Sequence, residues 1–226
     1  DKGLAVVVRR FVPKDRSPLT ETGLLNAIFD GKHVYIKDDS HLVGMSNVDG
    51  IQLSGSFKVR GVFNQVYLSI ERVLIRALAG DSKAMDLLDK GLRIVTQTDG
   101  NHGISMIRAT SAAIAIFLDE YPPFTRQLLR IAPQVFTIDH LAKVKEKDMK
   151  SARDEYLRFI KRHGIDFKEE IIDFTGCNYA EALNRRMAYL AERDEADYME
   201  HGGRDIIIGH GSAGLEIAEQ LRAAGV

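Results

Sequence analysis

The stretch "GLRIVTQTDGNHGISMIRA", residues 91–109, contains a strand, a turn and the start of a helix in direct succession. The run 91–98 is rich in β-branched side chains, which predicts a strand. Gly100 and Gly103 then allow the backbone to turn tightly, and the apolar residues that follow, up to position 121, predict a largely buried helix. A strand that turns directly into a helix is half of a βαβ unit. This stretch therefore favours an α/β fold with a mostly parallel, twisted sheet.

The rest of the chain alternates in the same way. Residues 204–225 indicate a strand or extended segment, a glycine turn and a helix. The stretch 121–133 contains Pro122, Pro123 and Pro133, and predicts either a long connection or a helix broken at both ends. Further strands are expected at 33–39, 133–138 and 169–176, and further helices at 58–80, 143–164 and 178–196.

Composition excludes several classes of partner. The 226 residues carry a formal net charge of -1, which gives no long-range field to attract nucleic acid or an anionic membrane. No apolar run approaches the length that spans a bilayer. No signal peptide is recognised at the start, where "GLAVVVRRFV" (3–12) is instead a candidate first strand. Cys177 is the single cysteine, so no internal disulfide is expected and a reducing, cytoplasmic location fits.

A second stretch, "QLSGSFKVRG" (52–61), places one lysine between an aromatic residue and a valine, directly after a flexible turn. Lys58 can be a solvated lysine at the start of the expected helix. It can also be held in a pocket for covalent chemistry, with Phe57 and Val59 as apolar walls that favour the uncharged, nucleophilic amine. The stretch alone leaves both interpretations open.

The loop "TQTDGNHG" (96–103) has the features of an anion site. Its glycines let the backbone approach a ligand, and the free N–H groups of the helix that follows point to the same place. Thr98, Asn101 and His102 add polar side chains. Asp99 is discordant, because a carboxylate in an anion site costs energy unless the protein uses it. The alternative is an ordinary βα turn with an Asp-Gly pair.

Other motifs are interpreted structurally. "GHGSAG" (209–214) matches G-x-G-x-x-G, but no second strand with an acidic residue follows it, so we interpret it as a turn that lets the last helix pack. His140, His163 and His201 lie in polar surroundings without the spacing of metal ligands, so no metal is expected. In "KDD" (37–39) the charges are expected to pair with basic neighbours, and the Lys/Glu run at 143–150 is typical of a solvated helix face.

Four segments together resemble one family, and they are "KDDSHL" (37–42), "SGSFKVRG" (54–61), "TDGNHG" (98–103) and "GHGSAGLEIAEQL" (209–221). They are similar to segments of the fold-type-II pyridoxal-phosphate enzymes, a group that includes threonine dehydratase, D-serine ammonia-lyase and diaminopropionate ammonia-lyase. The resemblance implies a two-part α/β fold like that of the tryptophan synthase β subunit. It implies that 1–84 and 191–226 belong to a larger cofactor domain, and 85–190 to a smaller domain that carries the "TDGNHG" loop.

The resemblance also implies roles for individual residues. Lys58 would bind pyridoxal 5′-phosphate covalently and then act as a general base beside the substrate Cα. Asp99 would face that carbon from the opposite side and take the proton from a D-amino acid, unless it merely caps the following helix. The implied cofactor contacts are Lys58, Phe57 and Asn101, and the implied substrate contacts are Ser56, Thr98, Gly100 and His102.

Two interpretations of the whole chain follow from this resemblance. In the first, the chain is a cytoplasmic ammonia-lyase or dehydratase that converts a small serine-like amino acid to a 2-oxo acid and ammonia. In the second, it is a non-catalytic fragment or subunit that acts as a binding or assembly module. The family's glycine-rich phosphate cradle would begin near Val226, so the sequence suggests a fragment or a unit whose remainder a complementing polypeptide supplies. A homodimer is the other expected partner state. A nucleotide-binding domain that uses 209–214 is a third, weaker interpretation.

Overall fold

The computed structural model describes residues 18–22, 33–39, 56–138, 145–176 and 178–226. Three features discussed above lie outside the described residues, and these are the candidate first strand at 3–12, His140 and Cys177.

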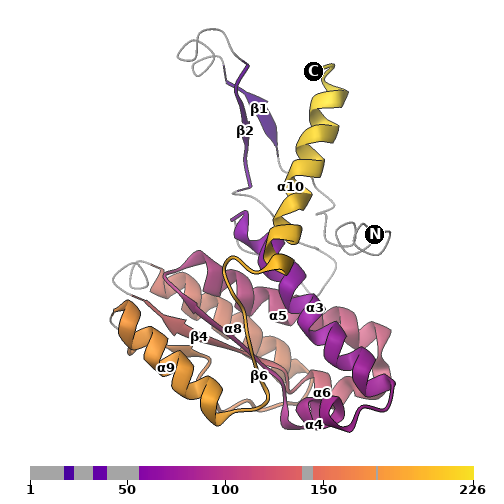
Figure 1. Cartoon of the computed structure of the whole chain (residues 1–226), viewed down its shortest axis with the longest axis vertical. Helices are drawn as coiled ribbons and strands as arrows, with labels where there is room; N and C mark the ends of the chain where they lie inside the picture. The colour runs from indigo at the N-terminus through magenta and orange to yellow at the C-terminus, as the bar shows by residue number, and fades with distance from the viewer. Residues whose placement is uncertain (1–17, 23–32, 40–55, 139–144, 177) are drawn as a thin grey trace.

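A parallel sheet forms the centre of the molecule, as the strand–helix alternation predicts (Figure 1). Its strand order is β5-β4-β3-β6. β3 pairs in parallel with β4 on one side, from Arg93↔Ala132 to Thr98↔Thr137, and with β6 on the other. β5 is shorter than the strand expected over 169–176, and β6 is not predicted by the sequence pattern. The strands are β3 (Arg93–Thr98), β4 (Ala132–Thr137), β5 (Ile172–Asp173) and β6 (Ala196–Tyr198).

The helices follow the expected order. The proline-containing stretch 121–133 is a short helical connection made of η1 (Pro122–Phe124) and α6 (Thr125–Leu128). The long helices are α3 (Lys58–Leu78), α5 (Asn101–Glu120), α8 (Glu146–Arg162), α9 (Tyr179–Glu192) and α10 (Arg204–Ala223), with the shorter α4 (Ser82–Lys90) after α3.

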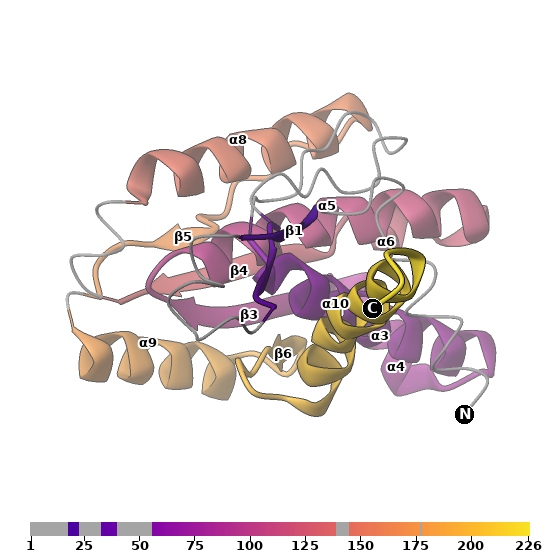
Figure 2. The same ribbon diagram turned by 90° about the horizontal axis from the view of Figure 1, so that it is seen from above.

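The two faces of the sheet carry different helices, because successive residues of a strand point to opposite sides. Val135 belongs to the main apolar core together with residues of α3, α5 and α8. Its neighbour Phe136 packs edge-on against Tyr189 of α9, with 5.6 Å between ring centroids. The result is three layers, with α9 on one face and α5, flanked by α3 and α8, on the other (Figure 2).

A small antiparallel ribbon lies beside α10. It consists of β1 (Leu19–Glu21) and β2 (Tyr35–Lys37), paired so that Thr20 faces Ile36. At its end, Lys37 Nζ donates to Gln220 Oε1 at 2.7 Å and lies 2.9 Å from Glu216 Oε2. This contact joins the ribbon to the part of α10 that extends away from the sheet (Figure 1).

A buried ion network joins the ribbon, α3 and α10. Arg60 is only 4% exposed, and its guanidinium donates to both oxygens of Glu216 at 2.8 and 3.0 Å. It also donates to both oxygens of Asp39, at 3.1 and 3.2 Å, which confirms that the "KDD" segment pairs with a basic neighbour. Burial alone would raise the pKa of Glu216, but hydrogen bonds from Arg60 and Lys37 outweigh it and lower that pKa. Charges this deep are tolerated only when they are paired in this way.

The C-terminal segment differs from its prediction. Residues 204–223 form one continuous helix, so the strand and glycine turn expected there are wrong, and so is the nucleotide-loop interpretation of 209–214. The reason is a close helix crossing. A Cβ on Gly209 would lie 2.5 Å from the carbonyl oxygen of Arg60 and 2.8 Å from Gly61 Cα. Gly209 therefore lets α10 approach α3, which is a use of glycine that leaves the helix intact.

We predict opposite effects for two glycine substitutions in α10. Gly209→Ala should lower the free energy of unfolding by about 1–3 kcal/mol, because the added methyl meets the backbone of α3. Gly211→Ala, at an exposed position with nothing within 4 Å, should raise it by about 0.5–1 kcal/mol, because alanine favours helix more than glycine does. Urea denaturation of both variants checks this, and equal shifts of the two midpoints would contradict the crossing.

We also predict that Glu216→Gln changes how stability depends on pH. Because the pKa of Glu216 is lowered in the folded state, its stabilisation is complete above the ordinary value of 4.5 and is lost as the pH falls through the folded value. The amide should cost about 3 kcal/mol at neutral pH, since a buried guanidinium loses a charged partner. It should also flatten the acid side of the curve of unfolding free energy against pH. Asp119→Asn, at an exposed site near the end of α5, is the control and should change neither quantity.

Candidate active site

Lys58 is the first residue of α3, and it is partly exposed. Its backbone N–H donates to Ser56 Oγ at 3.3 Å, so the serine orients the start of the helix. Phe57, which precedes the helix, is 55% exposed and packs against the ring of His210, with 5.2 Å between centroids. The sequence predicts a helix over 58–80, and the structure confirms that this helix begins at Lys58.

The loop 98–103 leaves the carboxyl end of β3 and opens α5. The amides of Gly100 and Gly103 donate to Thr98 Oγ1 at 3.0 and 3.2 Å, and Thr98 is 1% exposed. Thr98 thus supports the loop from inside. Asn101, the first residue of α5, is partly exposed at the same end of the sheet.

Gly103 fixes how closely α5 sits on the sheet. A Cβ at this position would lie 2.5 Å from Thr98 Cγ2 and 2.9 Å from Val135 Cγ1, so no side chain fits. On the outer side of the loop, a Cβ on Gly100 would meet Lys145 Cγ at 3.2 Å. Lys145 belongs to the run interpreted above as a solvated helix face, and its stem in fact covers the loop.

Asp99 is exposed beside this loop. The N-cap of α5 is Gly100, and the side chain that accepts from the loop amides is that of Thr98. The interpretation of Asp99 as a helix cap is therefore wrong. Its carboxylate instead acts on His201, whose pKa it raises against the stronger lowering effects of burial and of Lys58.

Histidines connect Lys58 to the loop. His102 is 2% exposed, and its ring stacks on that of His201 with 3.9 Å between centroids. Burial lowers the pKa of His102 to about 3, with further lowering by the charges of His201, Lys58 and His210. The pKa of His210 is also lowered, by burial first and by Arg60 and Lys58 as well. The charge of Lys58 thus acts on His102 within the 98–103 loop and on His210 of α10.

His201 and His210 are neighbours of the site that the sequence does not predict. His201 was grouped with histidines in polar surroundings, and His210 lies inside the motif interpreted as a turn. No local pattern signals either contact, since His201 and His102 belong to distant segments. His102 itself was included because it lies within the loop motif.

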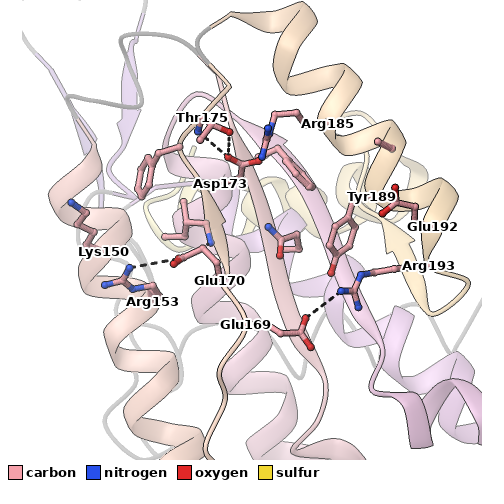
Figure 3. A pocket seen from close by; sticks show the side chains of 15 residues that line it. Lys150, Arg153, Glu169, Glu170, Asp173, Thr175, Arg185, Tyr189, Glu192 and Arg193 are labelled. Atoms are coloured by element: carbon pink, nitrogen blue, oxygen red, sulfur yellow. Dashed lines mark hydrogen bonds and ion pairs between the residues drawn. The ribbon is translucent and has the colours of Figure 1, made fainter.

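A cavity of about 850 Å³ lies elsewhere, between β5, α8 and α9. Its charged residues are largely paired with one another (Figure 3): Arg185 donates to Asp173, and Arg153 lies 3.7 Å from Glu170. Neither Lys58 nor the 98–103 loop lines it. Because its charges neutralise each other, we assign the candidate active site to the carboxyl end of β3.

The described residues contain neither a membrane-spanning helix nor a metal-binding cluster. Among them, no helix combines the length and apolar character that a membrane crossing needs. In the same part of the chain, no group of His, Cys, Asp and Glu side chains has the arrangement of a metal site.

Comparison with solved structures found similar folds. A pyridoxal 5′-phosphate-dependent aspartate racemase matches with a TM-score of 0.60 and 16% identity, over 97% of this chain and 50% of that one. Diaminopropionate ammonia-lyase from Escherichia coli, in complex with an aminoacrylate-PLP azomethine reaction intermediate, matches with a TM-score of 0.58 and 17% identity, over 100% and 50%. The apo form of that lyase matches with a TM-score of 0.55 and 16% identity, over 99% and 53%.

No family sequence model matches the chain, and no curated protein is similar to it in sequence. The chain spans about half the length of the structures it matches. At these identities the likeness establishes the fold. The chain therefore has the α/β fold of fold-type-II pyridoxal-phosphate enzymes, as its sequence predicts.

Proposed function

We propose that this chain is part of a pyridoxal-phosphate-dependent ammonia-lyase that removes the β-substituent of a small serine-like amino acid. The products would be a 2-oxo acid and ammonia. The observation that carries the proposal is the proximity of Lys58, at the start of α3, to the loop at the carboxyl end of β3. The charge of Lys58 helps to lower the pKa of His102 in that loop, which supports a site shared by the two most specific sequence motifs.

The residues at this site fit one end of the cofactor. Lys58 and Asn101 are both partly exposed, and each is the first residue of its helix. Nε2 of His102 is buried and has no hydrogen-bond partner among the described residues. A cradle for the cofactor phosphate is not identified in that part of the chain. We propose that a further segment or a partner chain supplies it.

In the proposed chemistry, two residues transfer the proton at opposite faces of the substrate Cα. The cofactor, when bound, supplies the electron sink that makes the Cα proton removable. Lys58 holds or accepts that proton on one face, and Asp99 accepts it on the other. The N–H groups at the start of α5 bind the substrate carboxylate, helped by the helix dipole. Ser56, Gly100 and His102 stay proposed substrate contacts, and Thr98 acts by holding the loop amides.

Racemisation is a second candidate function. The fold match to an aspartate racemase favours it, because a racemase also needs a proton-transfer group on each face of Cα. The non-catalytic alternative, in which the chain is a binding or assembly module, remains open to the same experiments. The division into 1–84 with 191–226 and 85–190, and the cytoplasmic location, stay predictions and are part of this proposal.

We predict that Lys58→Ala abolishes covalent attachment of the cofactor. Wild-type protein incubated with pyridoxal 5′-phosphate should absorb in the violet, and borohydride should fix the cofactor on the peptide that contains Lys58. The alanine variant should do neither, because it lacks the amine that attacks the aldehyde. Lys145→Ala is the matched control, since this lysine also lies against the loop. If the colour is lost from the Lys145 variant and kept in the Lys58 variant, the assignment is wrong.

We predict that Asp99→Asn affects one substrate enantiomer more than the other. The amide keeps the shape and removes the proton acceptor, which typically costs on the order of a hundred- to ten-thousand-fold in rate. Elimination from D-serine should fall by this factor, and elimination from L-serine should fall less, because Lys58 serves that face. Both rates are measured with the complemented enzyme, which is this chain together with the further segment or partner chain that supplies the phosphate cradle. Equal losses on both enantiomers would make Asp99 a structural loop residue.

A further inference from the structure

The turn between β6 and α10 is tied to the body of the protein at both ends (Figure 1). The amide of Met199 donates to the carbonyl of Val95 at 2.7 Å, and Met199 O accepts from Thr96 Oγ1 at 3.3 Å. Beyond the turn, the buried Asn64 of α3 donates to the carbonyl of Asp205 at 2.6 Å. The chain between these anchors is short, so the position of its side chains is fixed by β3 and α3.

This turn carries His201 onto the 98–103 loop. The rings of His201 and His102 are 3.9 Å apart between centroids and 29° from parallel. His102 is almost completely buried, whereas His201 is exposed on its outer side. His102 is in the first turn of α5, so a ring that fixes His102 also fixes the helix start that presents the loop amides.

Burial and the nearby positive charges both favour an uncharged His201 ring. The pKa of His201 is lowered by burial first, then by Lys58 and by Arg186, while Asp99 opposes them. The pKa of His102, on its inner side, is lowered to about 3. Two neutral rings can stack beside Lys58 without adding a repulsive charge.

We propose that His201 is a positioning residue, whose ring holds His102 and thereby orients the first turn of α5 toward a substrate carboxylate. The stacking role stands on the contacts above. The carboxylate clause rests on the proposed function. Aromatic pairs of this kind contribute beyond the area they bury, and they act through ring geometry, so another flat ring should replace the imidazole.

Three variants test the stacking role in the chain itself. His201→Ala removes the ring, His201→Phe keeps a flat ring without a proton, and His163→Ala removes a different exposed histidine that packs on a buried ring, that of Phe159. Hydrogen exchange is measured at the amides of Gly103 and Ile104, which bond to Thr98 Oγ1 and to the carbonyl of Gly100. His102 is titrated by NMR.

In His201→Ala, exchange at these amides should rise by on the order of fivefold to tenfold, the size expected for the loss of one aromatic pair. The pKa of His102 should rise toward its ordinary value, since burial and His201 are its first two causes. His201→Phe should restore slow exchange and His163→Ala should leave it unchanged. Unchanged exchange in His201→Ala, or no rescue by phenylalanine, would overturn the stacking role.

The effect of His201 on binding of the substrate carboxylate is measured separately, as a change in KM. In the complemented enzyme, His201→Ala should raise KM for the amino acid with little change in kcat, and His201→Phe should restore KM. A KM that stays constant while the amides exchange faster would overturn this clause. If the wild-type enzyme eliminates nothing, the proposed function fails, and the exchange and titration results still decide the role of His201.

Discussion

The buried guanidinium of Arg60 is the constraint on which the arrangement of the site depends. Its partners Asp39 and Glu216 come from segments that are distant in sequence, one after β2 and one in α10. An unpaired charge at this depth would cost several kcal/mol, so neither partner can move away without a large penalty. Arg60 is two residues after Lys58. The ion network therefore fixes the end of α3 that carries the lysine, and it does so with groups that take no part in the proposed chemistry.

The close crossing of α3 and α10 brings the side chains of α10 toward the start of α3, where Lys58 lies. Gly61 and Gly209 let the two helices approach until the ring of His210 lies over Gly61. From there His210 also contacts Phe57, the residue before Lys58. At the amino end of α10, the turn that carries His201 is held against β3. α10 carries His210 and the turn before it carries His201, and the loop after β3 supplies the third imidazole near Lys58, that of His102.

The sequence predicts the β3–α5 unit well because its signals are local. β-branched residues, Gly100, Gly103 and an apolar helix follow one another without a gap. The error over 204–225 has a physical cause, since the spacing of glycines that forms a turn also permits a close helix crossing, and only the neighbouring helix distinguishes the two. β6 has three residues and too short a pattern to recognise. The stacking of His201 on His102 depends on the whole fold, so no local pattern contains it.

The neutral histidines around Lys58 have a common electrostatic consequence. The pKa values of His102, His201 and His210 are each lowered by burial and also by the charge of Lys58. A lowered pKa favours the uncharged form of each ring near neutral pH, so the imidazoles add polar groups without adding positive charge. Lys58 and Asp99 act on His201 in opposite directions, the first lowering its pKa and the second raising it. A cationic wall would compete with Lys58 for any anionic ligand and would attract Asp99 into an ion pair. Neutral imidazoles do neither, so the proton-transfer roles that we propose for Lys58 and Asp99 meet no competition from a charged histidine.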